Sequence, residues 1–188
     1  MYLKRRCAAA TSARHSPMRL PRKLAVSVAT LLLAACASFG NPSFSAGAPP
    51  AAIIAALGTP TARYDLADGY LLEYRRGPWG QQTYMARFDR DDRLVSYEQV
   101  LNTDKFASIK INVDNKDDVL RTIGAPSETT YLSLVHREVW SYPYRESNVW
   151  NSLMHVYFDN AGIVRRLENG PDPKFDPDRR RFGFGFGF

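Results

Sequence analysis

One pattern occurs twice in the chain, in Ile53-Ile54-Ala55-Ala56-Leu57-Gly58-Thr59-Pro60 and, 66 residues later, in Val119-Leu120-Arg121-Thr122-Ile123-Gly124-Ala125-Pro126. In both copies, apolar side chains at positions i, i+1 and i+4 share one face of a helix. A glycine directly after a helix provides a left-handed cap, and a proline two residues later prevents the helix from resuming. The sequence therefore predicts two short helices that end in the same way.

Strand-like segments follow each helix. Tyr70, Leu72 and Tyr74 alternate with their neighbours, and Trp140 stands at the position that matches Tyr74. Further strands are expected at 84–89, 93–100, 154–159 and 163–167, joined by the polar turns 90–92 and 160–162. The predicted fold class is α+β, with two tandem repeats, each a short helix packed on a three- to four-stranded antiparallel meander.

The charge of the chain is unevenly distributed. Of the 25 Lys and Arg residues, seven lie in residues 1–35, which contain no Asp or Glu, so the remainder carries 18 basic and 19 acidic residues. Nucleic-acid binding needs a basic surface, and the body of the protein lacks that excess. Because 45% of the residues are hydrophobic and 12% aromatic, the composition is typical of a folded domain. Two cysteines, Cys7 and Cys36, cannot build a disulfide framework.

The N-terminal segment has the pattern of a signal peptide. Basic residues precede twelve apolar or small residues, 24–35, which are too few to span a membrane as a helix. The end of this segment, Leu33-Ala34-Ala35-Cys36, resembles the lipobox of bacterial lipoproteins. The resemblance implies cleavage between Ala35 and Cys36 and a Cys36 that carries fatty acyl chains such as palmitate. An ordinary cleavage site beside a small buried cysteine is the alternative.

These patterns divide the chain into six parts, with flexible segments at both ends. The predicted parts are a signal peptide at 1–35 (with Met18 as an alternative start), a flexible tether at 36–48, a first repeat at 49–101, a connector at 102–113, a second repeat at 114–170, and a disordered tail rich in Arg, Phe and Gly at 171–188.

The sequence resembles the SmpA/OmlA (BamE-like) outer-membrane lipoproteins in four features. These are the lipobox, the helix with its Gly-x-Pro stop, the aromatic strand, and the segment Phe158-Asp159-Asn160-Ala161-Gly162-Ile163-Val164. The first copy has Asp92 where glycine is expected. Two such units in tandem also resemble the β-lactamase inhibitory protein. The resemblance covers about residues 49–168 and implies an outer-membrane protein that faces the periplasm, since Ala37 rather than Asp follows the cysteine.

No motif for catalysis or for a cofactor is present in the sequence. His155 is predicted to lie on a strand face that points to solvent, and the alternative is a general base beside Asp159 or Glu138. Neither acidic cluster, at 89–92 or at 114–118, has the spacing of a calcium loop. The chain is therefore predicted not to be an enzyme and to need no metal or cofactor.

Aromatic residues near the hairpins are the candidate contacts for a partner. We expect three of them, Trp79, Tyr144 and Trp150, at loop tips or edges. Exposed Trp and Tyr commonly anchor protein interfaces. The alternative is that the loops fold back and bury these side chains against the sheet. The leading hypothesis is a lipoprotein that binds proteins or lipid in the cell envelope, with a role in outer-membrane protein assembly. The alternative is an inhibitor-type module that clamps a periplasmic or secreted enzyme.

Overall fold

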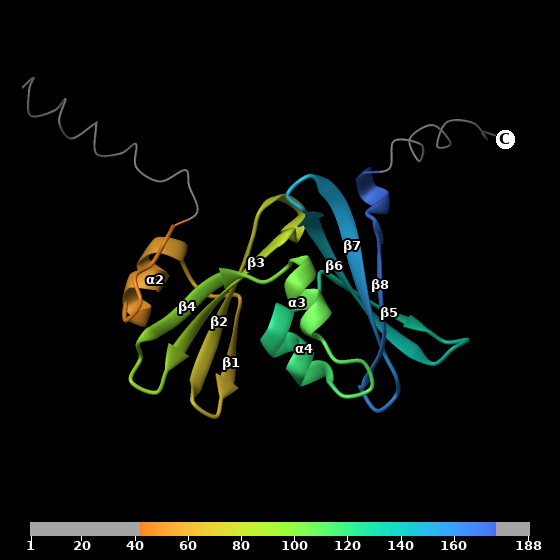
Figure 1. Cartoon of the computed structure of the whole chain (residues 1–188), viewed down its shortest axis with the longest axis horizontal. Coiled ribbons are helices and arrows are strands. Elements are labelled where there is room, and N and C mark those ends of the chain that lie inside the picture. The colour runs from red at the N-terminus through yellow and green to blue at the C-terminus, as the bar shows by residue number, and fades with distance from the viewer. Residues whose placement is uncertain (1–41, 176–188) are drawn as a thin grey trace, which may run out of the picture. The chain divides into compact units, whose positions relative to one another are not determined.

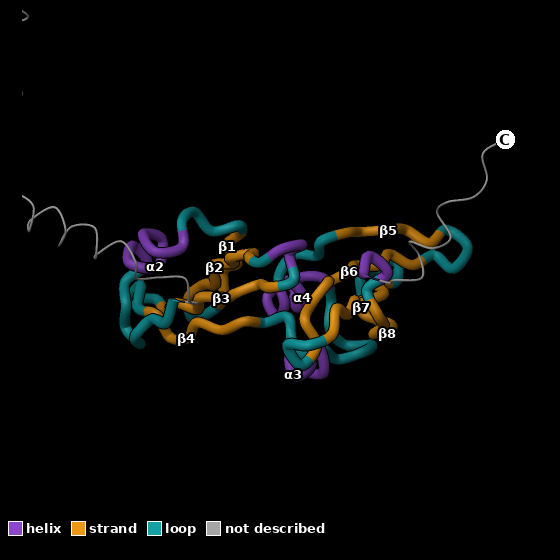
Figure 2. Tube along the Cα trace, turned by 90° about the horizontal axis from the view of Figure 1, so that it is seen from above, coloured by secondary structure: helices purple, strands orange, loops and turns teal. Residues whose placement is uncertain are grey.

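The computed structural model describes residues 42–175, which form two four-stranded antiparallel sheets and several short helices (Figure 1). The first sheet consists of β1 (Ala62–Leu66), β2 (Gly69–Arg76), β3 (Gln82–Asp89) and β4 (Leu94–Gln99). The second consists of β5 (Glu128–Leu132), β6 (Arg137–Glu146), β7 (Trp150–Phe158) and β8 (Val164–Pro171). The helical elements, purple in Figure 2, are α2 (Pro50–Leu57), η2 (Pro78–Gly80), α3 (Thr103–Ser108), α4 (Lys116–Ile123) and η3 (Pro173–Phe175). Within each sheet, every strand pairs with the next along the chain, and the predicted α+β class is confirmed.

The two predicted helices are α2 and α4. Helix α2 begins with Pro50 at its first position, and α4 begins with a capping box in which Asn115 and Asp118 bond each other's backbone N–H groups. Both end at a glycine with a positive φ, 84° at Gly58 and 83° at Gly124. In each case the glycine N–H donates to a carbonyl four residues earlier, which closes the last turn.

Two turns in the sheets share a hydrogen-bonding pattern. Oδ1 of Asp89 accepts the N–H groups two and four residues later, and Oδ1 of Asp159 does the same. A register shift directly precedes each turn, at Phe88 and at Phe158. The residue three positions after each aspartate has a positive φ, 56° at Asp92 and 76° at Gly162. Asp92 thus adopts the conformation that glycine adopts in the second turn, because Asp tolerates it better than most side chains.

The second sheet packs its inner face against α3 and α4. This core contains Phe106 of α3, Val119 and Ile123 of α4, and alternate side chains of the strands such as Trp140 and Val156. Helix α3 lies in segment 102–113, which is predicted as a connector. Its N-cap is Asn102, whose side chain accepts the N–H of Lys105. The segment therefore contributes a helix to the second core rather than only linking two repeats.

The first sheet is covered on both faces. Tyr70, Leu72 and Tyr74 belong to the cluster that contains Ile53 of α2, whereas Leu71 and Met85 belong to a cluster on the opposite face. Period-two alternation predicts the first of these faces correctly, but it does not show that the other face is also buried.

The buried second face of the first sheet carries the charged residues Glu73 and Arg75, which contact the turn after α4. Glu73 is 0% exposed, and its Oε2 accepts the N–H of Ala125 at 3.0 Å and the hydroxyl of Tyr64 at 2.6 Å. The Arg75 guanidinium donates to the carbonyl oxygens of Ala125 and Pro126, at 2.7 and 3.0 Å. The Gly-Ala-Pro stop of α4 is therefore a docking point for β2.

The described structure extends beyond both predicted limits of the folded body. Residues 44–48 are predicted as part of a flexible tether, but the ring of Phe44 packs edge-on against Tyr97 and the Gly47 N–H donates to the carbonyl of Leu94. The prediction is wrong for these residues, because an aromatic ring and backbone bonds attach them to the first sheet. The predicted signal peptide, Ala35 and Cys36 lie outside the described residues.

The predicted disordered tail is also wrong for residues 171–175. Pro171 pairs with Ser152 in the sheet, the Asp172 N–H donates to the carbonyl of Asn151, and Pro173–Phe175 form η3. Backbone hydrogen bonds to β7 stabilise this segment despite its two prolines. The rest of the predicted tail, 176–188, lies outside the described residues. Within residues 42–175, no helix has the length and apolar character to cross a membrane.

Candidate partner-binding surface

Two of the three aromatic residues predicted as partner contacts are exposed. The side chain of Trp79 is 58% exposed and that of Trp150 is 68% exposed. Trp79 lies in η2, the connection between β2 and β3, and its φ of 65° is in the left-handed region that bulky residues avoid. Strain of this kind is often found at functional sites. The two tryptophans are therefore the aromatic residues most available to a partner.

Tyr144 is buried, so its predicted place at a loop tip is wrong. It is 1% exposed, and its ring packs edge-on against Phe106 of α3 with ring centroids 4.8 Å apart. Tyr144 lies an even number of residues from Trp140 and Tyr142 on β6, and side chains at that spacing share one face of a strand. This spacing in the sequence is the signal that indicates a buried Tyr144.

A pocket of about 410 Å³ lies beside Trp79 on the outer face of the second sheet. We call it the Trp79 pocket. Its lining comes from the end of the sheet and from the segment after β8, and consists of Trp79, Ser127, Glu128, Ser141, Pro143, Leu153, Asp172, Pro173 and Lys174. The Lys174 ammonium stands 4.2 Å from the centre of the Trp79 ring, a cation–π geometry. The pocket thus lies between the connection that follows β2 and the second sheet, beside one exposed aromatic ring.

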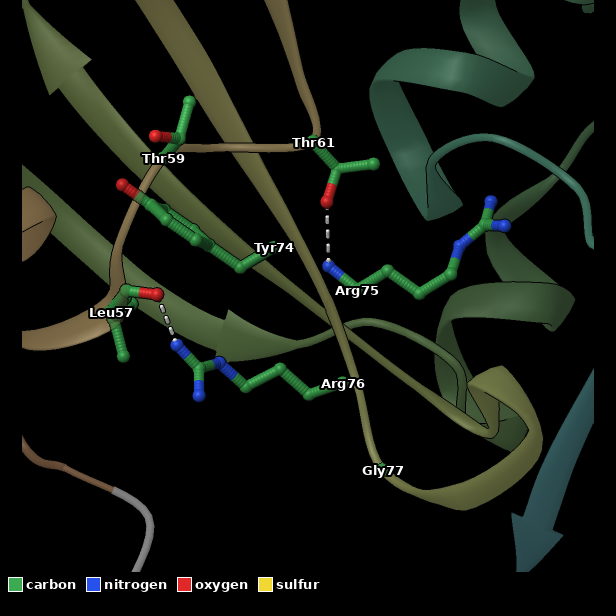
Figure 3. Close-up of a pocket in the computed structure, with 7 residues that line it drawn as sticks. All are labelled: Leu57, Thr59, Thr61, Tyr74, Arg75, Arg76 and Gly77. Atoms are coloured by element: carbon green, nitrogen blue, oxygen red, sulfur yellow. Dashed lines mark hydrogen bonds between the residues drawn. The ribbon is translucent and has the colours of Figure 1, made fainter.

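A second hollow, of about 480 Å³, lies at the stop of α2 (Figure 3). Its lining includes Leu57, Thr59, Tyr74 and Arg76. The Arg76 guanidinium donates to the carbonyl of Leu57 at 2.6 Å, and the buried hydroxyl of Tyr74 has no hydrogen-bond partner among the described residues. The space beside the turn after α2 is therefore open. Glu73 and Arg75 fill the corresponding space beside the turn after α4.

The two carboxylates considered as partners for His155 bond elsewhere. Glu138 accepts from Lys116 and from the Trp140 indole, both at 2.6 Å, and these bonds lower its pKa. The pKa of Asp159 is lowered mainly by the hydrogen bond from the backbone N–H of Ile163, and next by the hydrogen bond from Arg165. His155 instead has its Nδ1 2.9 Å from the hydroxyl of Ser141 and is half-buried on the outer face. The predicted strand position of His155 is confirmed, and the alternative of a general base beside either carboxylate is wrong.

One comparison with known families finds a match, and it lies in the second half of the described structure. Residues 98–168 match the outer membrane protein assembly factor BamE domain. The match begins at the end of β4 and includes α3, α4 and most of the second sheet. No curated protein and no solved structure matches the chain.

The family match supports the resemblance to the SmpA/OmlA proteins for residues 98–168. It includes α3, so the segment predicted as a connector lies inside the matched domain. The BamE family is one of outer-membrane assembly factors and not of enzymes. Sequence patterns predicted α4 and several strands of this domain, but they missed α3, the contact of the buried Glu73 with the turn after α4, and the pocket beside Trp79.

Proposed function

We propose that this chain is a non-enzymatic lipoprotein that is anchored to the outer membrane by an acylated Cys36, faces the periplasm, and supports the assembly of outer-membrane proteins by binding proteins of the envelope. The observation that carries the proposal is the match of residues 98–168 to the BamE domain. The lipobox-like sequence that ends at Cys36 supports the anchor. Acylation with two or three chains gives durable membrane binding.

We also propose that the described body contains two copies of one unit. The support comes from three shared features, which are a helix that ends at a glycine of positive φ, a four-stranded meander, and a bulge followed by an aspartate turn. In the second unit, α3 is an addition that has no counterpart before α2 among the described residues. The inhibitor-type alternative stays a prediction, since no finding favours it.

Trp79 and Trp150 are the proposed contacts for the partner. In envelope extracts solubilised with mild detergent, the native chain is expected to co-purify with outer-membrane assembly proteins identified by mass spectrometry. The double variant Trp79→Ala/Trp150→Ala is expected to recover at least about tenfold less of them, since exposed tryptophans are frequent hot spots. Val95→Ala, at an exposed valine of β4, is the matched control. Recovery of membrane-anchored protein without any assembly component would contradict the proposed function.

Cys36→Ser tests the anchor separately. We expect the variant to lose its acyl chains and to move from the membrane fraction to the soluble periplasmic fraction, because a hydroxyl cannot form the thioether to lipid. The measurement is fractionation combined with intact mass of the mature protein. Cys7→Ser is the control, and it should leave the distribution unchanged. A Cys36→Ser protein that stays lipid-modified and membrane-bound would show that the anchor lies elsewhere.

A further inference from the structure

The described chain ends at the rim of the Trp79 pocket. Asp172, Pro173 and Lys174 line one side of the pocket, and Phe175 is the last residue described. The ring of Phe175 meets that of Trp79 edge-on, with ring centroids 6.3 Å apart. Residues 176–188 therefore continue from a point that is already in contact with the pocket.

The pocket offers a defined chemistry to an occupant. Trp79, Pro143 and Leu153 provide apolar surface, and the Lys174 ammonium lies over the Trp79 ring. Glu128, at the start of β5, is exposed, and its carboxylate forms no ion pair or hydrogen bond within residues 42–175. A complementary ligand carries an aromatic or aliphatic group together with a cation.

Residues 176–188 provide both of these groups. They contain Arg179-Arg180-Arg181 followed by Phe182-Gly183-Phe184-Gly185-Phe186-Gly187-Phe188. In an extended chain, the alternating phenylalanines project to the same side, and the glycines on the other side add no bulk. Thirteen residues reach about 40 Å when extended, whereas four strands span only about 15 Å. The segment is thus long enough to cross the outer face of the second sheet from its starting point.

We propose that residues 176–188 fold back over the outer face of the second sheet, where phenylalanines of the Phe-Gly segment occupy the Trp79 pocket and the arginines face Glu128. The segment shields Trp79 from solvent while it is docked. The docking is intramolecular, so it does not depend on the identity of a partner or on the proposed anchor.

Hydroxyl-radical footprinting of the full chain tests the docked state. We compare the chain that carries Cys36→Ser with the same chain in which Phe182, Phe184, Phe186 and Phe188 are replaced by serine. Trp79 is expected to be oxidised several-fold faster in the serine variant. Trp150, which is 68% exposed in the described structure, serves as the internal control, with an unchanged rate. Equal oxidation of Trp79 in the two proteins would overturn the proposal, as would a change of the same size at Trp150.

Binding in trans gives a second and independent readout. A fluorescein-labelled peptide of residues 176–188 is titrated into the chain that ends at Phe175, which retains every described helix and strand. We expect saturable binding that weakens at least about tenfold with Trp79→Ala and changes less than about twofold with Trp150→Ala. Glu128→Gln should weaken binding and reduce its dependence on salt. A peptide of the same composition with the phenylalanines clustered is the specificity control, and equal binding of that peptide would contradict the proposal.

Discussion

Gly124→Ala is expected to destabilise the protein much more than Gly58→Ala, although both glycines end a helix with nearly the same backbone angles. Their φ and ψ values are 83° and −171° for Gly124, and 84° and −167° for Gly58. This region of φ and ψ is almost exclusive to glycine, and an alanine there costs about 1–3 kcal/mol. That strain is common to the two variants.

The surroundings of the two glycines differ. A Cβ at Gly124 would lie 2.9 Å from Oε2 of Glu73 and 3.0 Å from Cγ2 of Thr83, whereas a Cβ at Gly58 would meet nothing within 4 Å. The Glu73 carboxylate cannot move aside freely, because it accepts from Tyr64 and from the Ala125 N–H. Overpacking at a tight contact adds about 1–3 kcal/mol. The free energy of unfolding of Gly124→Ala should therefore fall by that additional amount.

Urea unfolding of the soluble Cys36→Ser chain, followed by circular dichroism, measures both variants. The difference between them isolates the contact of the first sheet with the turn after α4, because the backbone strain cancels. Equal destabilisation by Gly124→Ala and Gly58→Ala would mean that β2 does not form a tight contact with that turn in solution.

Glu73→Ala is expected to lower the free energy of unfolding by about 2–4 kcal/mol. Removal of the carboxylate leaves the Ala125 N–H and the Tyr64 hydroxyl, both partly buried, without their acceptor. It also removes the negative charge 4.0 Å from the Arg75 guanidinium. Glu73→Gln keeps an acceptor oxygen on a side chain of the same length, so the free energy of unfolding should fall by less.

Glu98→Ala is the control for the loss of a glutamate at an exposed position. Its carboxylate pairs with Lys105 at 2.8 Å, and both side chains are partly exposed to water. Exposed ion pairs contribute less than about 1 kcal/mol. Thermal unfolding of the three variants ranks the effects, and a Glu73→Ala protein as stable as Glu98→Ala would contradict the role of Glu73 as the link between β2 and the turn after α4.

Local features of this protein were predictable because each depends on a few neighbouring residues. The stop of each helix requires only a glycine and a nearby proline, as at Gly124 and Pro126. The aspartate turns and the capping of α4 by Asn115 arise from short side chains that bond their own backbone. The alternation of Tyr70, Leu72 and Tyr74 specified one buried face of β2.

The errors concern residues whose place depends on distant parts of the chain. Phe44 lies in a segment rich in Pro, Gly and Ser, and Asp172 stands between two prolines. Their order comes from contacts with Tyr97 and with the backbone of β7. Helix α3 is too short to be stable alone, and it is stabilised by burial of Phe106 in the second core. Composition cannot report such contacts.

The sequence by itself determined two short helices with identical stops, the strands that follow them, and an N-terminal segment with the pattern of a lipoprotein signal. Only the tertiary structure decided that Glu73 is buried at a docking point and that Trp79 borders a pocket. The physical reason is that a local pattern fixes which face of an element is apolar, whereas burial of a charge or exposure of an aromatic ring depends on which other surface lies against that face.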